Sequence, residues 1–393
     1  MSRGLADWKR FRRVLCVRPD NIGDVLMTTP AIRALKQALP AREVTLLTSG
    51  SGAAVAQFVP WIDDIEVFDP PWYRHEHPNG REDLRNFAEK LSRRNFDAAI
   101  IFTVFSQNPL ANAMLCYEAG IPRVAGYCRE NPYELITDWL PDNEPLNGAR
   151  HEVQRQLDLV AALGATSTEI GLSLNVPKER ASDAREVLRA AGIDPDAPWL
   201  LMHPGASEAR RRYPAEGFAM AAREIHSRLG IQVVITGSAT EAARAESIAE
   251  SAGPGICSAA GRLDMPAFIA LVSLAPLVVS NNTGPVHIAA AVGTPVVVLY
   301  ALTNPQHAPW GVPNRILPFD VPLENLSRNV LVRYAAERYF AEPRGSAAPE
   351  DIVNAVAELL QGAQDCPRGA ELVSPGASPG AIRSSELKIA SRT

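Results

Sequence analysis

Cysteine is scarce in this sequence of 393 residues: there are five, and no two of them form a CxxC pair. Their spacing is too wide for a zinc site, so we expect reduced thiols in a cytoplasmic protein. Long apolar runs are also absent, because none reaches the roughly 20 residues that span a bilayer. The N-terminal segment lacks the apolar stretch of a secretory signal. We therefore expect neither a transmembrane helix nor secretion.

A strong excess of positive charge is missing too, because the net charge is -5. This argues against nucleic acid as the main partner. No GxGxxG or Walker A motif occurs, so the usual dinucleotide fingerprint is absent. What is present is an ordinary globular balance, with 46% hydrophobic and 21% charged residues. The length suggests two domains, and composition alone leaves an enzyme or a binding protein.

Short apolar runs alternate with amphipathic stretches along most of the chain. In the first half the pattern predicts strands at 13–18, 43–48, 65–68 and 96–104, and helices at 24–39, 53–59 and 82–94. In the second half it predicts strands at 199–203, 231–236, 277–280 and 295–300, and helices at 214–229, 240–251, 266–274, 284–292 and 349–360. Such alternation indicates βαβ units, so the expected fold is α/β, with two Rossmann-like doubly wound parallel sheets facing a central cleft.

The domain bounds follow from a shift in composition. Thr, Ser, Asn and Pro gather near 166–178, which we interpret as a linker between an N-terminal domain at 1–165 and a C-terminal domain at 179–345. A C-terminal helix is expected at 346–361. The remainder, 362–393, is rich in Gly, Ser, Pro and Ala and is predicted to be a disordered tail.

The first candidate for chemistry lies where the strand at 13–18 becomes a helix. That turn faces the ligand crevice in an open α/β sheet. Gly23 lets the backbone approach a bound group, and Asp24 stands at the helix start. A carboxylate there would equally serve as a helix cap, and position alone does not decide between the two roles.

Two further strand ends carry polar motifs. His203-Pro204-Gly205-Ala206-Ser207 precedes three arginines at 210–212, which suit a diphosphate but would also suit a solvated basic loop. Ser280-Asn281-Asn282-Thr283-Gly284-Pro285-Val286-His287 begins a helix whose free N–H groups can bind an anion. His287 could be structural. The loop at 303–310, after the next strand, should face the same crevice.

Two acidic or histidine motifs do not predict a metal site. Asp194-Pro195-Asp196 spells DxD, but it precedes the strand at 199–203 and so lies at the wrong end, where we interpret it as a turn. His75-Glu76-His77 offers too few ligands for a metal.

Together these stretches resemble glycosyltransferase family 9, the lipopolysaccharide heptosyltransferases, which have the two-domain GT-B fold. The resemblance runs from about residue 13 to 360. It is carried by the IGDVLMTTPAIRALK stretch at 22–36, by HPGAS with the Arg-Arg-Tyr-Pro that follows, and by TGPVHIAAAVGTPVV at 283–297. Each stretch is weak alone, whereas three in order at matching strand ends are specific.

The resemblance implies roles for individual residues. Asp24 would be the general base, and Arg211 would contact the nucleotide diphosphate with Arg212 beside it. Glu241 would lie near the ribose and Leu263 near the base, both approximately placed. The expected donor-binding residues are Gly23, Ser207, Arg211, Arg212, Glu241, Leu263, Asn282, Thr283, Gly284, Pro285 and His287.

The implied reaction is an inverting, metal-independent transfer of a sugar from a nucleotide-sugar donor to a lipopolysaccharide core or related cell-surface glycan. The family default is heptose from ADP-heptose. No cofactor and no metal are expected, because one base and a cationic diphosphate site suffice. The partners are then the nucleotide-sugar donor and a lipid-linked glycan acceptor, with no nucleic acid.

One departure leaves alternatives open. Many relatives have Asp where this chain has Asn282, so a charge is lost while the shape and capping ability are kept. The chain could therefore be a family member with another donor, or a non-catalytic nucleotide-sugar-binding protein. A Rossmann dehydrogenase is disfavoured by the missing GxGxxG.

Peripheral contact with an anionic membrane, at the cytoplasmic face of the inner membrane, is a further expectation. Basic and aromatic residues alternate at 8–13, before the first strand, and more basic residues follow in the same half. Lysine and arginine are attracted to anionic lipid, and aromatics suit the interface. An ordinary solvated arm would explain the pattern equally well.

Overall fold

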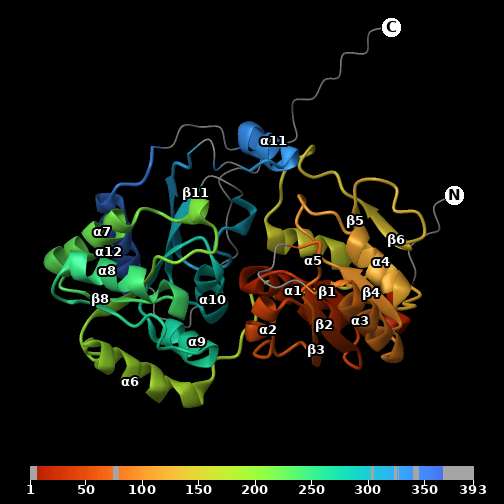
Figure 1. Cartoon of the computed structure of the whole chain (residues 1–393), viewed down its shortest axis with the longest axis horizontal. Coiled ribbons are helices and arrows are strands. Elements are labelled where there is room, and N and C mark those ends of the chain that lie inside the picture. Colours follow the sequence, from red (N-terminus) through yellow and green to blue (C-terminus); the bar gives the residue numbers. More distant parts are fainter. Residues whose placement is uncertain are drawn as a thin grey trace, which may run out of the picture.

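The computed structural model describes residues 7–73, 79–301, 305–322, 325, 327–339 and 345–365. Within these residues two parallel sheets of six strands each form separate halves of the molecule (Figure 1). Their strand orders are β3-β2-β1-β4-β5-β6 and β12-β11-β10-β7-β8-β9, the same doubly wound order twice. The fold class predicted from the sequence is confirmed.

The N-terminal half begins with a short 3-10 helix at Trp8–Arg10. Its strands are β1 (Arg13–Arg18), β2 (Glu43–Thr48), β3 (Asp64–Val67), β4 (Ala98–Ile101), β5 (Val124–Cys128) and β6 (Asp138–Pro141). Its helices are α1 (Ile22–Ala38), α2 (Gly50–Ala56), α3 (Arg81–Arg93), α4 (Leu110–Glu118) and α5 (Glu152–Ala162).

The C-terminal half repeats the plan. Its strands are β7 (Trp199–His203), β8 (Gln232–Ile235), β9 (Ile256–Ser258), β10 (Val278–Asn281), β11 (Val296–Ala301) and β12 (Asn314–Phe319). Its helices are α6 (Ala181–Ala191), α7 (Ala215–Leu229), α8 (Ala242–Ala252), α9 (Met265–Leu274) and α10 (Gly284–Val292). Two more follow, α11 (Val330–Tyr339) and α12 (Pro349–Asp365).

Side-chain alternation along the strands divides each core into two layers. In β1, Val14 and Cys16 join the cluster built on α1 and α5, whereas Leu15 and Val17 join the cluster built on α3 and α4. Both sheet faces are thus buried, which explains why the strands appear as continuous apolar runs. In the C-terminal half α12 packs on α7 and contributes Ile352 to the hydrophobic cluster formed by α7, α8 and one face of the sheet.

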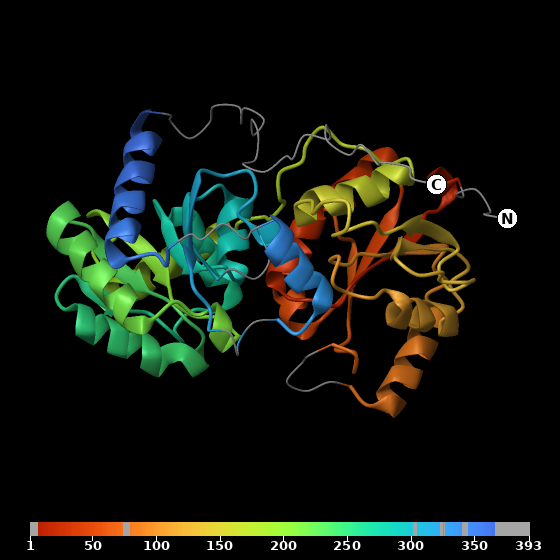
Figure 2. The same ribbon diagram turned by 90° about the horizontal axis from the view of Figure 1, so that it is seen from above.

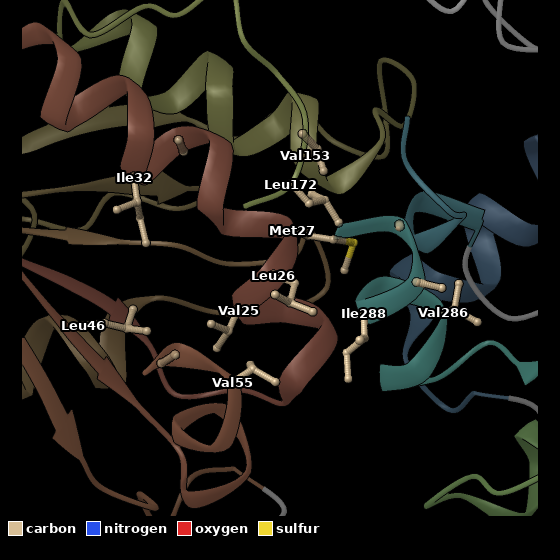
Figure 3. Close-up of a cluster of buried hydrophobic side chains, with 14 of the residues drawn as sticks. Val25, Leu26, Met27, Ile32, Leu46, Val55, Val153, Leu172, Val286 and Ile288 are labelled. Carbon is tan, nitrogen blue, oxygen red and sulfur yellow. The ribbon is translucent and has the colours of Figure 1, made fainter. Parts of the chain in front are cut away.

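One hydrophobic cluster runs through both halves. Figure 3 shows Leu26 and Met27 of α1 pointing toward α10, which carries Val286 and Ile288. All four side chains are at most 1% exposed. The first turns of α1 and α10 therefore meet between the two sheets, so the ends of β1 and β10 lie near one another.

The segment at 166–178 is irregular and is held against the N-terminal half. The Arg33 guanidinium donates to the carbonyl oxygens of Glu169 and Gly171, both at 3.1 Å. From the C-terminal half, Trp310 Nε1 donates to the Ile170 carbonyl at 2.8 Å. This segment connects the two halves.

Helix α11 lies between the two halves in both views (Figures 1 and 2). Just before it, Asn329 Nδ2 donates to the Ser106 carbonyl of the N-terminal half at 3.2 Å. α12 continues to Asp365, four residues past its expected end, and the predicted tail beyond it lies outside the described residues.

The N-terminal arm does not present aromatic side chains to a membrane, which corrects part of that expectation. Trp8 is 2% and Phe11 8% exposed, and their rings pack edge to face at 5.2 Å. Arg42 fixes the arm by donating to the Trp8 carbonyl at 2.6 Å. Only the charges of residues such as Lys9 and Arg10 remain exposed. No helix among the described residues is long and apolar enough to cross a bilayer.

Candidate active site

Asp24 lies in the first turn of α1, and its side chain is 20% exposed. Its Oδ1 accepts from Arg18 Nη2 at 3.1 Å, and its Oδ2 accepts from the Asn21 backbone N–H at 3.3 Å. The second contact is the helix-capping hydrogen bond, the role that the sequence offered as an alternative to that of a catalytic base. The carboxylate is thus held on two sides and keeps further lone pairs for another donor.

The charges around Asp24 keep it ionised. Burial alone would raise the pKa of this carboxyl. The Arg18 guanidinium opposes burial and holds the pKa below its ordinary value, with smaller effects from His307, His287 and Arg211. Asp24 is therefore a carboxylate at neutral pH, the form that can accept a proton.

Two glycines bring the two halves into contact beside Asp24. A Cβ on Gly23 would lie 2.5 Å from Cδ2 of His287, and one on Gly284 would lie 3.2 Å from Cγ2 of Ile22. Each glycine is in the first turn of its helix and faces a side chain of the other half. The close approach of α1 and α10 therefore leaves no room for a Cβ at Gly23 and little room at Gly284.

The three arginines before α7 have different partners. Arg210 Nε is paired with the Glu208 carboxylate, and Arg212 Nε donates to the Ala206 carbonyl at 2.7 Å. Arg211 is close enough to Asp24 and His287 to affect the pKa of both. Its Nε is buried without a hydrogen-bond partner. Arg211 is thus the arginine that faces the other half.

The start of α10 is arranged as an anion site. Thr283 is its N-cap residue, Pro285 at the second helical position has no N–H, and the Val286 N–H donates to the Thr283 carbonyl at 3.1 Å, so the Gly284 N–H is the first-turn donor left at this positive helix end. Behind them, Asn281 is fully buried; it accepts from the Tyr213 N–H at 3.0 Å and donates to the Pro204 carbonyl at 2.8 Å. Asn282 Oδ1 is buried without a partner.

Two histidines face Asp24 from the C-terminal half. Burial lowers the pKa of His287 to about 4 and that of His307 to about 3. Both imidazoles are therefore neutral at neutral pH. Nδ1 of His287 and Nε2 of His307 are buried without a hydrogen-bond partner. Together with Arg211 and Asn282, they leave four unpaired polar groups around one place, which is typical of a site built for a polar ligand.

The remaining expected residues lie along the same strand edge, toward β8 and β9. Glu241 accepts from the backbone N–H and the hydroxyl of Ser238, both at 2.9 Å. A Cβ on Gly205 would lie 2.4 Å from the Glu241 carboxylate. Ser207 is exposed, and Leu263 is half-buried in the loop after β9. These residues form a second group, distinct from the one around Asp24.

Neither of the two acidic or histidine motifs was predicted to bind a metal, and the structure describes one of them. Asp194-Pro195-Asp196 is a turn before β7, as predicted, and Asp196 pairs with Arg185 at 3.3 Å. His75-Glu76-His77 lies outside the described residues.

Comparison with known proteins assigns the chain to a family. The family model described as glycosyltransferase family 9 (heptosyltransferase) matches residues 84–337, about two thirds of the chain. The chain belongs to glycosyltransferase family 9. It is similar to lipopolysaccharide heptosyltransferase 1 of Pseudomonas aeruginosa, with 27% identity over 300 residues, 75% of this chain and 79% of that protein.

Solved structures of this family share the fold. The family 9 glycosyl transferase of Veillonella parvula matches with a TM-score of 0.72 at 20% identity, over 91% of this chain and 99% of its own. The E. coli ADP-heptose LPS heptosyltransferase II matches with a TM-score of 0.68 at 19% identity, over 90% and 99%. The chain is thus a glycosyltransferase of the GT-B fold, as the resemblance implied.

Arg18, Glu152 and His151 of this candidate site were not singled out from the sequence. Arg18 and Glu152 lie beside Asp24 on β1 and α5, whereas His307 belongs to the loop at 303–310 that was expected to face the crevice. His151 caps α5 by accepting the Val153 N–H at 3.1 Å, so its Nε2 donates to the Ala308 carbonyl at 2.9 Å. The sequence signal that could have revealed Arg18 and Glu152 is a charged residue at a position where the strand or helix pattern expects an apolar one.

Proposed function

We propose that the enzyme transfers heptose from ADP-heptose to a lipopolysaccharide core or related glycan, with inversion at the anomeric carbon. The relative from Pseudomonas aeruginosa is named a lipopolysaccharide heptosyltransferase, and the E. coli structure is titled an ADP-heptose enzyme. The observation that carries the proposal is the position of Asp24 in one half, facing Arg211 and the N-terminus of α10 in the other.

The chemistry follows from these positions. Asp24 accepts the proton of an acceptor hydroxyl as that oxygen attacks the anomeric carbon. The new glycosidic bond forms on the face opposite the diphosphate, and the bond to the diphosphate breaks with its electron pair. Arg211 and the positive N-terminal end of α10, with its Gly284 N–H, stabilise the charge that develops on the leaving diphosphate.

This arrangement supplies the positive charge that the leaving group needs, so we propose that transfer requires no divalent metal. Arg211 has a guanidinium nitrogen without a partner, and a guanidinium matches phosphate oxygens. The neutral imidazoles of His287 and His307 add polar groups without charge, suited to sugar hydroxyls.

The direct test is to incubate the protein with ADP-heptose and a heptose-deficient lipopolysaccharide core, following ADP release and the mass of the glycan. Gain of one heptose on the glycan supports the proposal. Release of ADP only by hydrolysis, or no release, would favour the non-catalytic binding protein instead. The anomeric configuration of the product, determined by NMR, tests inversion.

Asn282 favours one narrower alternative, a different nucleotide-sugar donor. Its Oδ1 is buried without a partner at the start of α10, where it would accept a hydrogen bond from a ligand but carries no charge. A thermal-shift screen of nucleotide sugars distinguishes the two: the largest stabilisation by ADP-heptose supports the family donor, and a larger one by another sugar nucleotide overturns it.

A further inference from the structure

Arg18 ends β1, and its side chain is fully buried. Its guanidinium faces three carboxylates from two elements and the loop between β1 and α1. Nη2 lies 3.1 Å from Asp24 Oδ1 and 3.0 Å from Glu152 Oε1, and Nε lies 3.2 Å from Asp20 Oδ2. A single cation therefore connects Asp24 to two buried acids.

Both buried acids are themselves held in place. Asp20 Oδ1 accepts from Gln107 Nε2 at 2.7 Å, and Glu152 Oε1 accepts from Gln156 Nε2. Gln156 in turn donates to the Thr103 carbonyl at 3.0 Å. Asp20 is thus anchored to the loop after β4 and Glu152 to α5, so the Arg18 guanidinium is held by carboxylates that are themselves fixed.

We propose that Arg18 is a positioning residue that fixes and ionises the Asp24 carboxylate. This inference rests on the proposed function, in which Asp24 is the base. With Oδ1 bound to Arg18 and Oδ2 bound to the Asn21 N–H, rotation of the carboxylate is restricted. The planar guanidinium places Nη2 against Asp24 and Glu152 and Nε against Asp20, a fixed spread of donors that the single nitrogen of an ammonium does not reproduce.

Every charged or titratable group near Asp24 bears on its ionisation. Arg18 comes from β1, Arg211 from the segment before α7, His287 from α10 and His307 from the loop after β11. Since burial keeps both imidazoles neutral, only the two arginines are positive at neutral pH. Two nearby carboxyls, Asp20 and Glu152, oppose ionisation of Asp24, and burial raises the pKa of each, that of Asp20 to about 7.

Replacing Arg18 should therefore move the acid limb of the pH–rate profile. With Arg18→Gln, Asp24 faces two acids without the adjacent cation, so the limb of kcat/KM should move up by about 1–3 pH units, the usual effect of an adjacent arginine. Activity should recover as the pH is raised. The KM for the nucleotide sugar should change less than about threefold, because the three ion-pair partners of Arg18 all belong to the N-terminal half.

Arg18→Lys separates charge from orientation and covers the case in which the glutamine variant does not fold. We expect its acid limb near that of the wild type, but kcat about tenfold lower, because a flexible ammonium does not keep the fixed direction of the guanidinium Nη2. Wild-type kcat together with a wild-type limb in this variant would refute the positioning role.

The matched control is Arg42→Gln, since Arg42 is 2% exposed and donates to the backbone carbonyls of Trp8, Leu35 and Phe11. It should lower the melting temperature without moving the acid limb. An unmoved limb in Arg18→Gln, while Asp24→Asn is inactive, would make Arg18 merely structural. Activity retained in Asp24→Asn would refute the base itself and leave the two failures distinguishable.

Discussion

Gly23→Ala tests the contact between the two halves with the smallest possible change. The added Cβ would lie 2.5 Å from Cδ2 of His287, whereas ordinary contacts begin near 3.4 Å. The ring or the whole of α10 must therefore move by about 1 Å. His287 is 4% exposed and has little room to yield. Overpacking of this kind costs about 1–3 kcal/mol of folding free energy.

The displacement should cost more activity than stability. A shift of about 1 Å between reacting groups can lower turnover by about 100-fold, since Asp24 and the diphosphate site lie on opposite sides of this contact. Turnover with ADP-heptose and the midpoint of urea unfolding measure the two effects.

Two alanine substitutions calibrate the result. In Gly50→Ala the nearest atom is a side-chain oxygen of Asp69 at 3.4 Å, so we expect wild-type turnover and equal or higher stability. In Gly284→Ala the nearest atom is Cγ2 of Ile22 at 3.2 Å, which predicts an intermediate effect. If Gly23→Ala matches Gly50→Ala in both measurements, α1 and α10 do not meet as described.

Three more predictions follow from the site. Arg211→Ala should weaken binding of ADP, measured by calorimetry, by about 1.5–3 kcal/mol, the scale of a charged hydrogen bond. Arg210→Ala should do less, because Arg210 is paired with Glu208, and equal losses would indicate a diffuse basic surface. Transfer should persist in EDTA, and a strict requirement for added metal would contradict the proposed site. Unfolding free energy should fall between about pH 6.5 and 4, by up to about 1.4 kcal/mol per pH unit for each histidine, because the unfolded chain takes up the proton first. The histidines concerned are His151, His203, His287 and His307. An unfolding free energy that does not change over this pH range would show that they are not buried and neutral.

The sequence predicts β1 to β4, β7, β8, β10 and β11 but misses β5, β6, β9 and β12. β1 and β11 are buried on both faces and stand out from the sequence. β6 (DWLP) and β12 (NRILPF) lie at sheet edges and contain proline, and β9 has only three residues. Strand propensity is weak at such edges because only one neighbour specifies the pairing.

Helix α5 was missed for a related reason. Its buried face includes Glu152, Arg155 and Gln156, so the apolar period that indicates a helix is interrupted. The same polar face is what surrounds the site. The apolar periodicity fails in α5 because buried charged residues of this helix help to hold Asp24. Ion pairs between residues distant in the sequence cannot be predicted from one sequence.

The expected site residues separate into two groups by the order of the strands. Asp24, Arg211 and His287 converge because β1 and β10 end close together at the contact of α1 with α10. Glu241 and Leu263 follow β8 and β9 and lie farther along the edge. Motif positions predicted which strand ends carry polar residues, but not which of them meet across the two halves.

The most direct test of the account is the turnover number of Asp24→Asn with ADP-heptose and a heptose-deficient core. Asparagine keeps the shape and the bond to Arg18 but cannot accept the acceptor's proton. The account predicts a fall in turnover of about 2 to 4 powers of ten, with ADP affinity within about threefold of the wild type. Turnover near the wild-type value would contradict it and leave Asp24 as the cap of α1.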